Sequence, residues 1–307
     1  MSRFFCWLLC SGCLLAADFP RQWFLHAHNC YPKHGAGYDR LARARRAGLT
    51  AFELDLAWSE ARSRTVLSHE TKLDGHEPTI EQYFFEPFLP ELRKLPAGKP
   101  GILLFFDFKS DHPGPVKEVY RLLSLHRDLV TTAGTRGDPP DKPLRFGPLT
   151  VILTGDNSAI AQFEKLTPDG EPYLAMGNRE PLDRKFQENI ENYIPALATA
   201  FYRVFNFEWK HIERDPNFQA GPFTPAKRAR LQALVKLAHA KGYWLRTWTL
   251  NATNADWGSN QNFGSKPAML ERWRAALEVG VEMVVTDEYE LAGGFLRAER
   301  LAVPRNG

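Results

Sequence analysis

Cysteine is scarce in this chain of 307 residues, and its distribution excludes a fold held by crosslinks. Three of the four cysteines (Cys6, Cys10 and Cys13) lie in an apolar segment at the N-terminus, and the other is Cys30. If that segment is removed, no pair remains for an intramolecular disulfide, and no CxxC metal motif survives. Stability must therefore come from a buried core, which a hydrophobic content of 44% can supply.

An excess of either charge is also missing. The chain has 39 Lys and Arg against 36 Asp and Glu, a formal net charge of +3, and it shows no basic tail or stripe. Nucleic acid is therefore not expected as a partner. Internal repeats and linkers are missing as well, so the length fits a single α/β domain.

Hydrophobic runs that could span a bilayer are lacking. The apolar run 4–15 is too short, but it follows a basic residue and precedes small residues, which is the pattern of an export signal. We expect residues 1–17 to be a signal peptide and 18–307 to be a single exported domain, periplasmic or extracellular. The alternatives are a buried N-terminal strand and a lipoprotein anchored through Cys13.

Beyond this segment, strand-like apolar runs alternate with helical patterns. The run 102–108 suits a strand buried on both faces, and 226–241 is an amphipathic helix. Eight such units in series predict a (β/α)8 barrel of the TIM type. An open doubly wound sheet would need a glycine-rich first turn, and 26–32 has none. The expected strands are 23–28, 51–57, 102–108, 149–153, 173–176, 201–205, 243–249 and 283–286, with a short extra strand at 65–68.

Two acidic residues lie two positions apart in the second expected strand. Glu53 and Asp55 point to the same face, because side chains alternate along a strand. At a barrel mouth two carboxylates repel each other unless a cation lies between them. Asp107 interrupts an apolar strand and would complete an oxygen site for Mg2+ or Ca2+, with Lys109 on the same face. The alternatives are two solvent-facing acids and a simple Asp107–Lys109 ion pair.

Histidines follow two of the expected strands. The active site of a barrel lies at the carboxyl ends of its strands, so His26 and His69 would share the mouth with the acids. One imidazole can be charged and the other neutral near pH 7, as acid–base catalysis requires. His28 and Asn29 could instead contact metal or substrate. Trp248 could floor the pocket or belong to the core.

Several strings along the chain form a recognisable series. They are HAHNCYP (26–32), AGLTAFELDLAW (47–58), VLSHE (66–70), FFDFKSD (105–111), YWLRTWTLN (243–251) and MVVTDEYELAGGFL (283–296). The series resembles the PLC-like phosphodiesterase superfamily, which contains glycerophosphodiester phosphodiesterases and phosphatidylinositol-specific phospholipases C. The FFDFKSD string is similar to the DxK strand of spider-venom sphingomyelinase D. The HxHN start is similar to the branch called altered inheritance of mitochondria protein 6.

This resemblance implies a metal-dependent phosphoric diester hydrolase. It implies one divalent cation, Mg2+ before Ca2+, and two histidines that act as acid and base, with their order left open. The residues that would carry these roles are Glu53, Asp55 and Asp107 for the metal, His26 and His69 for catalysis, and Lys109, His28, Asn29 and Trp248 for the substrate.

The chain departs from the family pattern at two positions. Cys30 stands where the branch usually has Asp, and Ala27 replaces an Arg that often binds phosphate in glycerophosphodiesterases. The expected substrate is therefore a small phosphodiester or lipid head group, of phospholipid-derived or glycerophospho type, and transient contact with a membrane surface fits it. Both hydrolysis and release of a cyclic phosphate remain open.

Two other functions compete with this interpretation. The first is a zinc amidohydrolase or phosphoesterase barrel, because His26 and His28 form an HxH pair on the first strand. That class needs further histidines after strands five and six, and only His211 lies nearby. The second is a non-catalytic barrel that binds a ligand at an aromatic mouth. Binding alone would not require acid, base and metal residues together.

We expect the mature protein to begin near Asp18, because signal peptidases cut after small residues that follow an apolar run. N-terminal sequencing of the exported product should show that start. A mature chain that begins at Met1 would contradict the export signal, and a lipid-modified Cys13 would replace it with an anchor.

Overall fold

The computed structural model describes residues 19–32, 39–70, 72–96, 98–181, 193–213, 221–248, 250–252 and 263–299. Within these ranges eight parallel strands form a closed ring. Strand β1 pairs with β2 on one side and with β9 on the other, and this double pairing closes the barrel. The expected (β/α)8 fold is confirmed. The segment 1–17 lies outside the described residues, so its removal stays a prediction.

The barrel strands follow one another round the ring in chain order. They are β1 (Leu25–Ala27), β2 (Ala51–Ser59), β4 (Ile102–Phe108), β5 (Leu149–Gly155), β6 (Met176–Arg179), β7 (Tyr202–Glu208), β8 (Trp244–Trp248) and β9 (Met283–Thr286). Strand β3 (Arg64–Leu67) lies outside the ring, where it pairs antiparallel with the end of β2.

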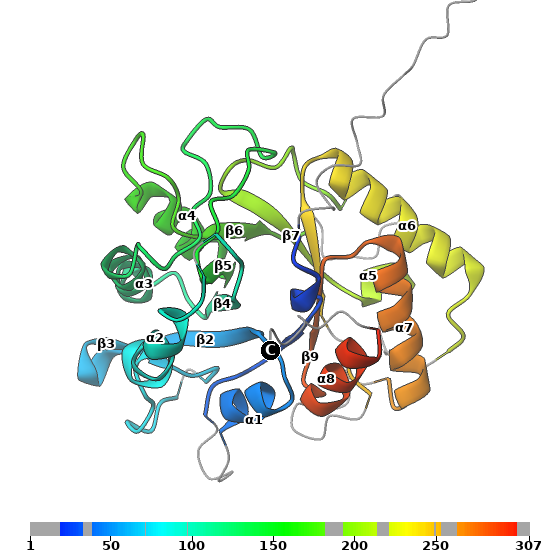
Figure 1. Ribbon diagram of the computed structural model, residues 1–307, viewed down its shortest axis with the longest axis horizontal. Helices are drawn as coiled ribbons and strands as arrows, with labels where there is room; N and C mark the ends of the chain where they lie inside the picture. Colours follow the sequence, from blue (N-terminus) through cyan, green and yellow to red (C-terminus); the bar gives the residue numbers. More distant parts are fainter. Residues whose placement is uncertain are drawn as a thin grey trace, which may run out of the picture.

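Helices surround the strands, as Figure 1 shows. They are α1 (Arg40–Arg46), α2 (Glu86–Leu92) after a π-helical turn at Glu81–Phe85, α3 (Pro113–Leu125), α4 (Asn157–Leu166), α5 (Lys210–Glu213), α6 (Pro225–Ala240), α7 (Lys266–Val279) and α8 (Tyr289–Ala298). Short 3-10 turns occur at Arg21–Trp23 and Glu60–Arg62. In the described part of the chain, none of the helices is both long and apolar enough to cross a membrane.

Side-chain alternation along β2 separates the core from the site. The ring of Phe52 lies 6.2 Å from that of Phe88 on α2, so this side of the strand faces the helices. Glu53 and Asp55 must then point into the barrel, because successive side chains face opposite ways. Both are buried. The position of β2 in a closed ring therefore excludes the alternative in which these acids face solvent.

The fifth strand starts later than expected. Residues 173–176 are apolar, but Tyr173 pairs its backbone with Ala133 and Gly134 of a long loop and not with a neighbouring strand. The strand ladder begins at Met176, which pairs with Ile152 of β5. Residues 173–176 are buried, as the apolar run indicated. The backbone of Tyr173 is hydrogen-bonded to the loop, so the strand β6 is Met176–Arg179.

The short extra strand β3 forms a hairpin with β2 that positions His69. Strand β2 continues past the barrel rim to Ser59 and turns back through Ser63, which has a left-handed backbone (φ 46°). Strand β3 then runs antiparallel to β2, with Leu67 opposite Leu56. This hairpin brings His69 back towards the barrel mouth. The expected strand at 65–68 is confirmed with a shift of one residue.

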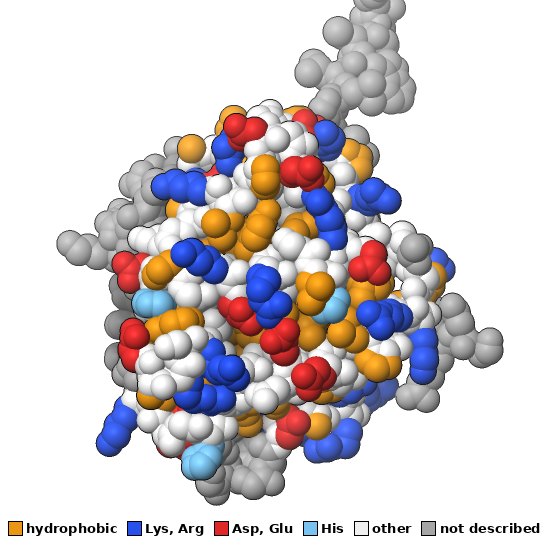
Figure 2. Space-filling model, turned by 90° about the vertical axis from the view of Figure 1, so that its left-hand side faces the viewer, with side chains coloured by type: hydrophobic (Ala, Val, Ile, Leu, Met, Phe, Trp, Pro, Cys, Tyr) orange, Lys and Arg blue, Asp and Glu red, His pale blue; other side chains and the backbone are white. Residues whose placement is uncertain are grey.

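The outer surface mixes acidic, basic and apolar side chains. Among the described residues on the face in Figure 2, red, blue and orange groups alternate, and no charge of one sign dominates. The pattern agrees with the small net charge of +3. Partners that need a continuous basic surface, such as nucleic acid, find none on this face.

Helix α8 packs against the end of α1 through a glycine. A Cβ atom added at Gly293 would lie 1.9 Å from the backbone oxygen of Ala47, whereas the same atom at Gly294 would meet nothing within 4 Å. The close packing of α8 against α1 therefore requires a glycine at position 293 but not at position 294.

We predict opposite effects for alanine at these two positions. Alanine favours a helix over glycine by about 0.8–1.0 kcal/mol, so Gly294→Ala should stabilise the fold by up to about that amount. Gly293→Ala should destabilise it by roughly 1–3 kcal/mol, because the backbones of α1 and α8 must move apart. Urea unfolding of the two variants measures the difference. Equal midpoints would contradict the close packing.

Candidate active site

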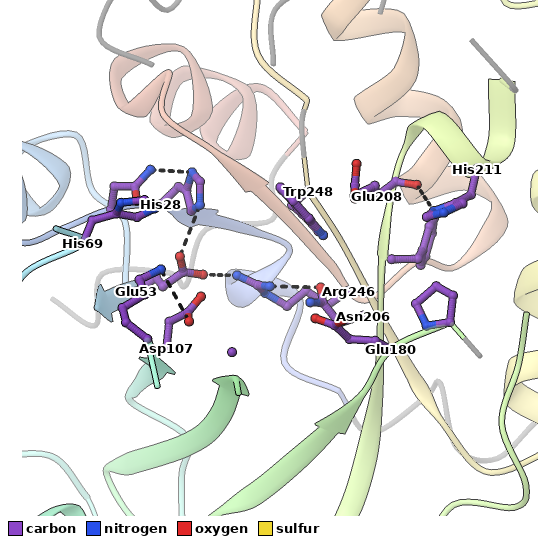
Figure 3. Close-up of a pocket in the computed structure, with 15 residues that line it drawn as sticks. His28, Glu53, His69, Asp107, Glu180, Asn206, Glu208, His211, Arg246 and Trp248 are labelled. Atoms are coloured by element: carbon purple, nitrogen blue, oxygen red, sulfur yellow. Dashed lines mark hydrogen bonds and ion pairs between the residues drawn. The ribbon is translucent and has the colours of Figure 1, made fainter. Parts of the chain in front are cut away.

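A cavity of about 330 Å³ opens among the barrel strand ends. Most of its walls are polar side chains from β2, β4, β7 and β8 and from the segments that follow β1 and β3. Figure 3 shows two ends of this cavity with Arg246 between them. One end holds His28, His69, Glu53 and Asp107, and the other holds Glu208, His211 and Trp248.

Three carboxylates meet at the first end. Glu53, Asp55 and Asp107 each offer an oxygen within 4.8 Å of the others. Strand register causes this meeting, because Asp55 on β2 stands beside Asp107 on β4. Lys109 continues the same face of the chain, and its Nζ lies 3.1 Å from Asp55 and 3.5 Å from Asp107. The structure thus brings together the acids and the lysine that the sequence singled out.

Burial makes this cluster electrostatically costly. It raises the pKa of Asp55 to about 7, because Lys109 only partly offsets the desolvation and Asp107 and Glu53 add repulsion. The pKa of Asp107 is raised for the same main reason. Among the described residues, the buried oxygens of Asp55 have the Lys109 ammonium as their ion-pair partner and accept no other hydrogen bond. Carboxylate oxygens facing two other carboxylates fit a hard divalent cation such as Mg2+ or Ca2+.

His28 contacts this cluster from β1. Its Nε2 lies 3.2 Å from Glu53, and its Nδ1 lies 3.2 Å from Asp287, the residue after β9. Burial lowers the pKa of His28, but the carboxylates of Asp287 and Glu53 more than offset this and raise it to about 9. Asn251 donates a hydrogen bond to the same Asp287 oxygen at 2.8 Å. The imidazole is therefore held in one orientation and kept charged.

Asn29 supports His28 and lines the cavity as well. Its backbone is left-handed (φ 53°), a conformation that asparagine tolerates better than most residues. Its Nδ2 lies 2.7 Å from Nδ1 of His28 and 3.2 Å from the second oxygen of Asp287. The expectation that Asn29 contacts substrate stays a prediction, since these contacts direct its amide towards His28 and Asp287.

His69 reaches the cavity from the opposite direction, after β3. Its side chain is 46% exposed, and it lines the same cavity as His28. Burial lowers its pKa, and the charge of Lys109 lowers it further. His28 and His69 thus have pKa values displaced in opposite directions, which leaves His28 charged and His69 neutral at pH 7.

His26 does not lie at the mouth, and this corrects the expected placement. It is fully buried and stacks on Phe105, with 4.5 Å between ring centres. Residues two apart on a strand share a face but lie in successive layers, so His26 is one layer below His28. Burial, followed by the charges of Arg246 and His28, lowers the pKa of His26 well below its usual value. Its catalytic role stays a prediction, which this position does not favour.

Among the charged residues of the site, Glu180, Glu208, Arg246 and Asp287 received no role from the sequence. Arg246 on β8 ion-pairs with Glu53 and donates to Asn206 at 2.9 Å. Asp287 holds His28, as described above. A signal for Arg246 did exist: like Asp107, it is a charged residue inside a buried strand, and such a residue needs a partner. Trp248 lines the far end of the cavity, and its role in substrate binding stays a prediction.

Comparison with solved structures finds similar chains. A Ca2+-dependent phosphatidylinositol-specific phospholipase C from Streptomyces antibioticus is 16% identical over 89% of this chain and 96% of its own, with a TM-score of 0.51. Glycerophosphodiester phosphodiesterase from Agrobacterium tumefaciens is 13% identical over 88% and 99% (TM-score 0.47). A glycerophosphoryl diester phosphodiesterase domain from Mycobacterium tuberculosis is 13% identical over 89% and 98% (TM-score 0.44).

Comparisons at the level of sequence add nothing to this. No family model matches the chain, and no curated protein matches it. At 16% identity the likeness to the Streptomyces phospholipase shows a shared fold and leaves activity to be argued from the site. None of these findings bears on the narrower branch named from the HxHN start.

The carboxylate cluster predicts a stabilising response to divalent cations. Mg2+ or Ca2+ should raise the unfolding midpoint of the wild type, because binding to the folded state alone stabilises it. Asp55→Asn should abolish that rise. Without a cation the same variant should be more stable than wild type at pH 8, since the raised pKa means that ionising Asp55 costs stability as pH passes about 7.

The measurement is thermal unfolding with EDTA or with added cation. Glu60→Gln is the matched control, because Glu60 is 84% exposed and lies outside the cluster. That variant should respond to cations as the wild type does. A midpoint of the wild type that ignores both cations would rule out the metal site.

Proposed function

We propose that this protein is a metal-dependent phosphoric diester hydrolase. The observation that carries the proposal is a cavity lined by two members of a three-carboxylate cluster, Glu53 and Asp107, and by His28 and His69, whose pKa values are displaced in opposite directions. This combination supplies a cation site, an acid and a base within reach of one phosphorus atom. The shared fold with the Streptomyces phospholipase supports the same class of reaction.

Glu53, Asp55 and Asp107 would hold the cation. When bound, it would polarise a non-bridging oxygen of the phosphodiester and neutralise developing charge. We propose Mg2+ as the cation. Ca2+ should be tested as well, since the Streptomyces phospholipase is described as Ca2+-dependent. Lys109 lines the cavity 3.1 Å from Asp55, and it can place its charge on a second phosphate oxygen.

His28 replaces His26 in the proposed acid–base pair. With its pKa raised to about 9, His28 is protonated at neutral pH and can give a proton to the leaving alkoxide. Asp287 accepts from its other nitrogen and keeps the donating Nε2 directed at the cluster. His69 has a lowered pKa and is neutral, so it can accept the proton of the attacking oxygen.

The alcohol groups of the substrate would occupy the rest of the cavity. Its far end combines carboxylate, amide and aromatic side chains from β6, β7 and β8, which suits a polar head group better than a long hydrocarbon. We propose a small glycerophospho or lipid-derived phosphodiester, met by an exported enzyme (residues 18–307) in solution or in brief contact with a membrane surface. Phosphorus NMR of a substrate panel would identify the alcohols and reveal any cyclic product.

The zinc-barrel alternative lacks its ligands in the described ranges. The residue group that could hold a metal there consists of three carboxylates and no histidine. His26 and His28 do not converge on one point, since His26 contacts Arg246 in the layer below. A non-catalytic ligand-binding barrel is distinguished by assay: it would not hydrolyse bis-p-nitrophenyl phosphate with or without EDTA.

We predict that His28→Ala and His69→Ala each lower turnover of bis-p-nitrophenyl phosphate roughly 10²–10⁴-fold, the usual contribution of a general acid or base. The double variant should lose less than the product of both effects, because the residues act in one step. His76→Ala, an exposed histidine outside the cavity, is the control. If His26→Ala loses activity while His28→Ala keeps it, the original assignment on the first strand is correct.

The pH profile of kcat/KM tests the order of acid and base. It should rise at low pH as His69 loses its proton, through a value below 6.5, and fall at high pH as His28 loses its own near 9. A bound cation beside Glu53 would lower the pKa of His28 and so move the alkaline limb to lower pH. In residual activity, His69→Ala should lack the acid limb and His28→Ala the alkaline limb. The reverse pattern would exchange the two roles.

A further inference from the structure

Arg246 lies in the interior of the barrel beside the carboxylate cluster, and it lines the cavity. Its side chain is 4% exposed, and each guanidinium nitrogen has a partner. Nη2 pairs with Glu53, Nη1 donates to Asn206 at 2.9 Å, and Nε donates to Nε2 of His26 at 3.3 Å. The guanidinium carbon lies 4.7 Å from the centre of the Phe105 ring. The acid–base scheme proposed above uses none of these contacts.

The formal charges of the cluster and its partners indicate what Arg246 contributes. The three acids of the cluster (Glu53, Asp55 and Asp107) contact two permanent cations among the described residues, Lys109 and Arg246. With all three acids ionised, these five groups together carry one negative charge, and the adjacent His28–Asp287 ion pair adds none. A divalent cation would change the sum to one positive charge. A phosphodiester carries a single negative charge. Without Arg246 the cation-loaded site would be neutral, and its attraction for such a substrate would be lost.

We propose that Arg246 is a positioning residue that serves as a built-in cation of the metal site: it fixes Glu53 and keeps the cation-loaded cluster positive, while His26 and Asn206 hold its guanidinium in place. The inference rests on the proposed function, since it takes the cluster to be a cation site. It also gives His26 a use, because a neutral imidazole can accept the Nε–H of Arg246 where a second cation could not.

Two consequences separate this role from that of an ordinary buried ion pair. Three carboxylates that lose one of two permanent cations repel each other more strongly, so the cation-free protein should lose stability. A divalent ion that binds beside the cluster no longer faces the guanidinium, so its affinity should rise by about tenfold or more. A residue that merely fills the core would lower stability by the same amount with and without the ion.

The experiment compares Arg246→Met with Arg246→Lys. Methionine keeps much of the length and removes the charge, whereas lysine keeps the charge and loses the fork. Arg203→Met is the matched control: Arg203 on β7 is also buried, but it donates to the backbone oxygen of Lys142 at 2.6 Å, and its guanidinium lies 5.9 Å from the ring centre of Trp244. Ca2+ affinity is measured by isothermal titration, and unfolding midpoints are measured in EDTA and in saturating Ca2+.

The proposal expects tighter Ca2+ binding and a larger Ca2+-induced rise in midpoint for Arg246→Met than for wild type. Arg246→Lys and Arg203→Met should bind Ca2+ as the wild type does. Should Arg246→Met fold only when Ca2+ is present, that too supports the charge role. Unchanged or weaker Ca2+ binding in Arg246→Met overturns it. If that variant fails to fold under both conditions, Arg246→Lys decides: a loss of Ca2+ affinity with the charge retained refutes the electrostatic role.

A third outcome concerns the proposed function and not this inference. If wild-type protein binds neither Ca2+ nor Mg2+ in the titration, the metal-dependent hydrolase itself is rejected. If the wild type binds Ca2+ and the variants differ from it only in stability, the hydrolase proposal stands and Arg246 is a structural residue.

Discussion

Repulsion among three carboxylates is the constraint on which the candidate site depends. Glu53, Asp55 and Asp107 are held within 4.8 Å of one another by the register of β2 against β4, and a protein interior does not tolerate such a group uncompensated. Compensation comes from three sides: Lys109 directly after β4, His28 directly after β1, and Arg246 on β8. Side chains from across the ring thus converge on this one group.

The alternation of a closed barrel organises this compensation into layers. Odd-numbered positions of β2 and β4 and even-numbered positions of β1 and β8 point inward, so residues two apart form successive layers along the barrel axis. The upper layer holds His28 beside the acids, and the layer below holds His26 against Phe105. The upper layer is where chemistry can occur. The lower layer holds the buried His26, which accepts a hydrogen bond from Arg246.

The pKa values of His28 and His69 are displaced in opposite directions because the two residues follow different parts of the fold. His28 is attached to a barrel strand, so it lies deep enough to contact two carboxylates, and these raise its pKa despite burial. His69 comes from the hairpin outside the ring, where burial and the charge of Lys109 lower its pKa and Glu70, 4.0 Å away, offsets this only in part. Histidine at the end of a barrel strand (His28) is therefore charged at pH 7, whereas histidine after the hairpin (His69) is neutral.

The sequence by itself determined the barrel, its strand order and the pairing of Glu53 with Asp55 and of Asp107 with Lys109, because strand alternation and apolar runs are local properties of the chain. It also marked His69. Tertiary structure alone decided the depth of His26 and the contacts of Arg246 and Asp287. Depth along a barrel axis depends on strand tilt and on the closure of β1 against β9. That pairing, the contact of Arg246 with His26 and the contact of Asp287 with His28 all join residues more than 200 positions apart.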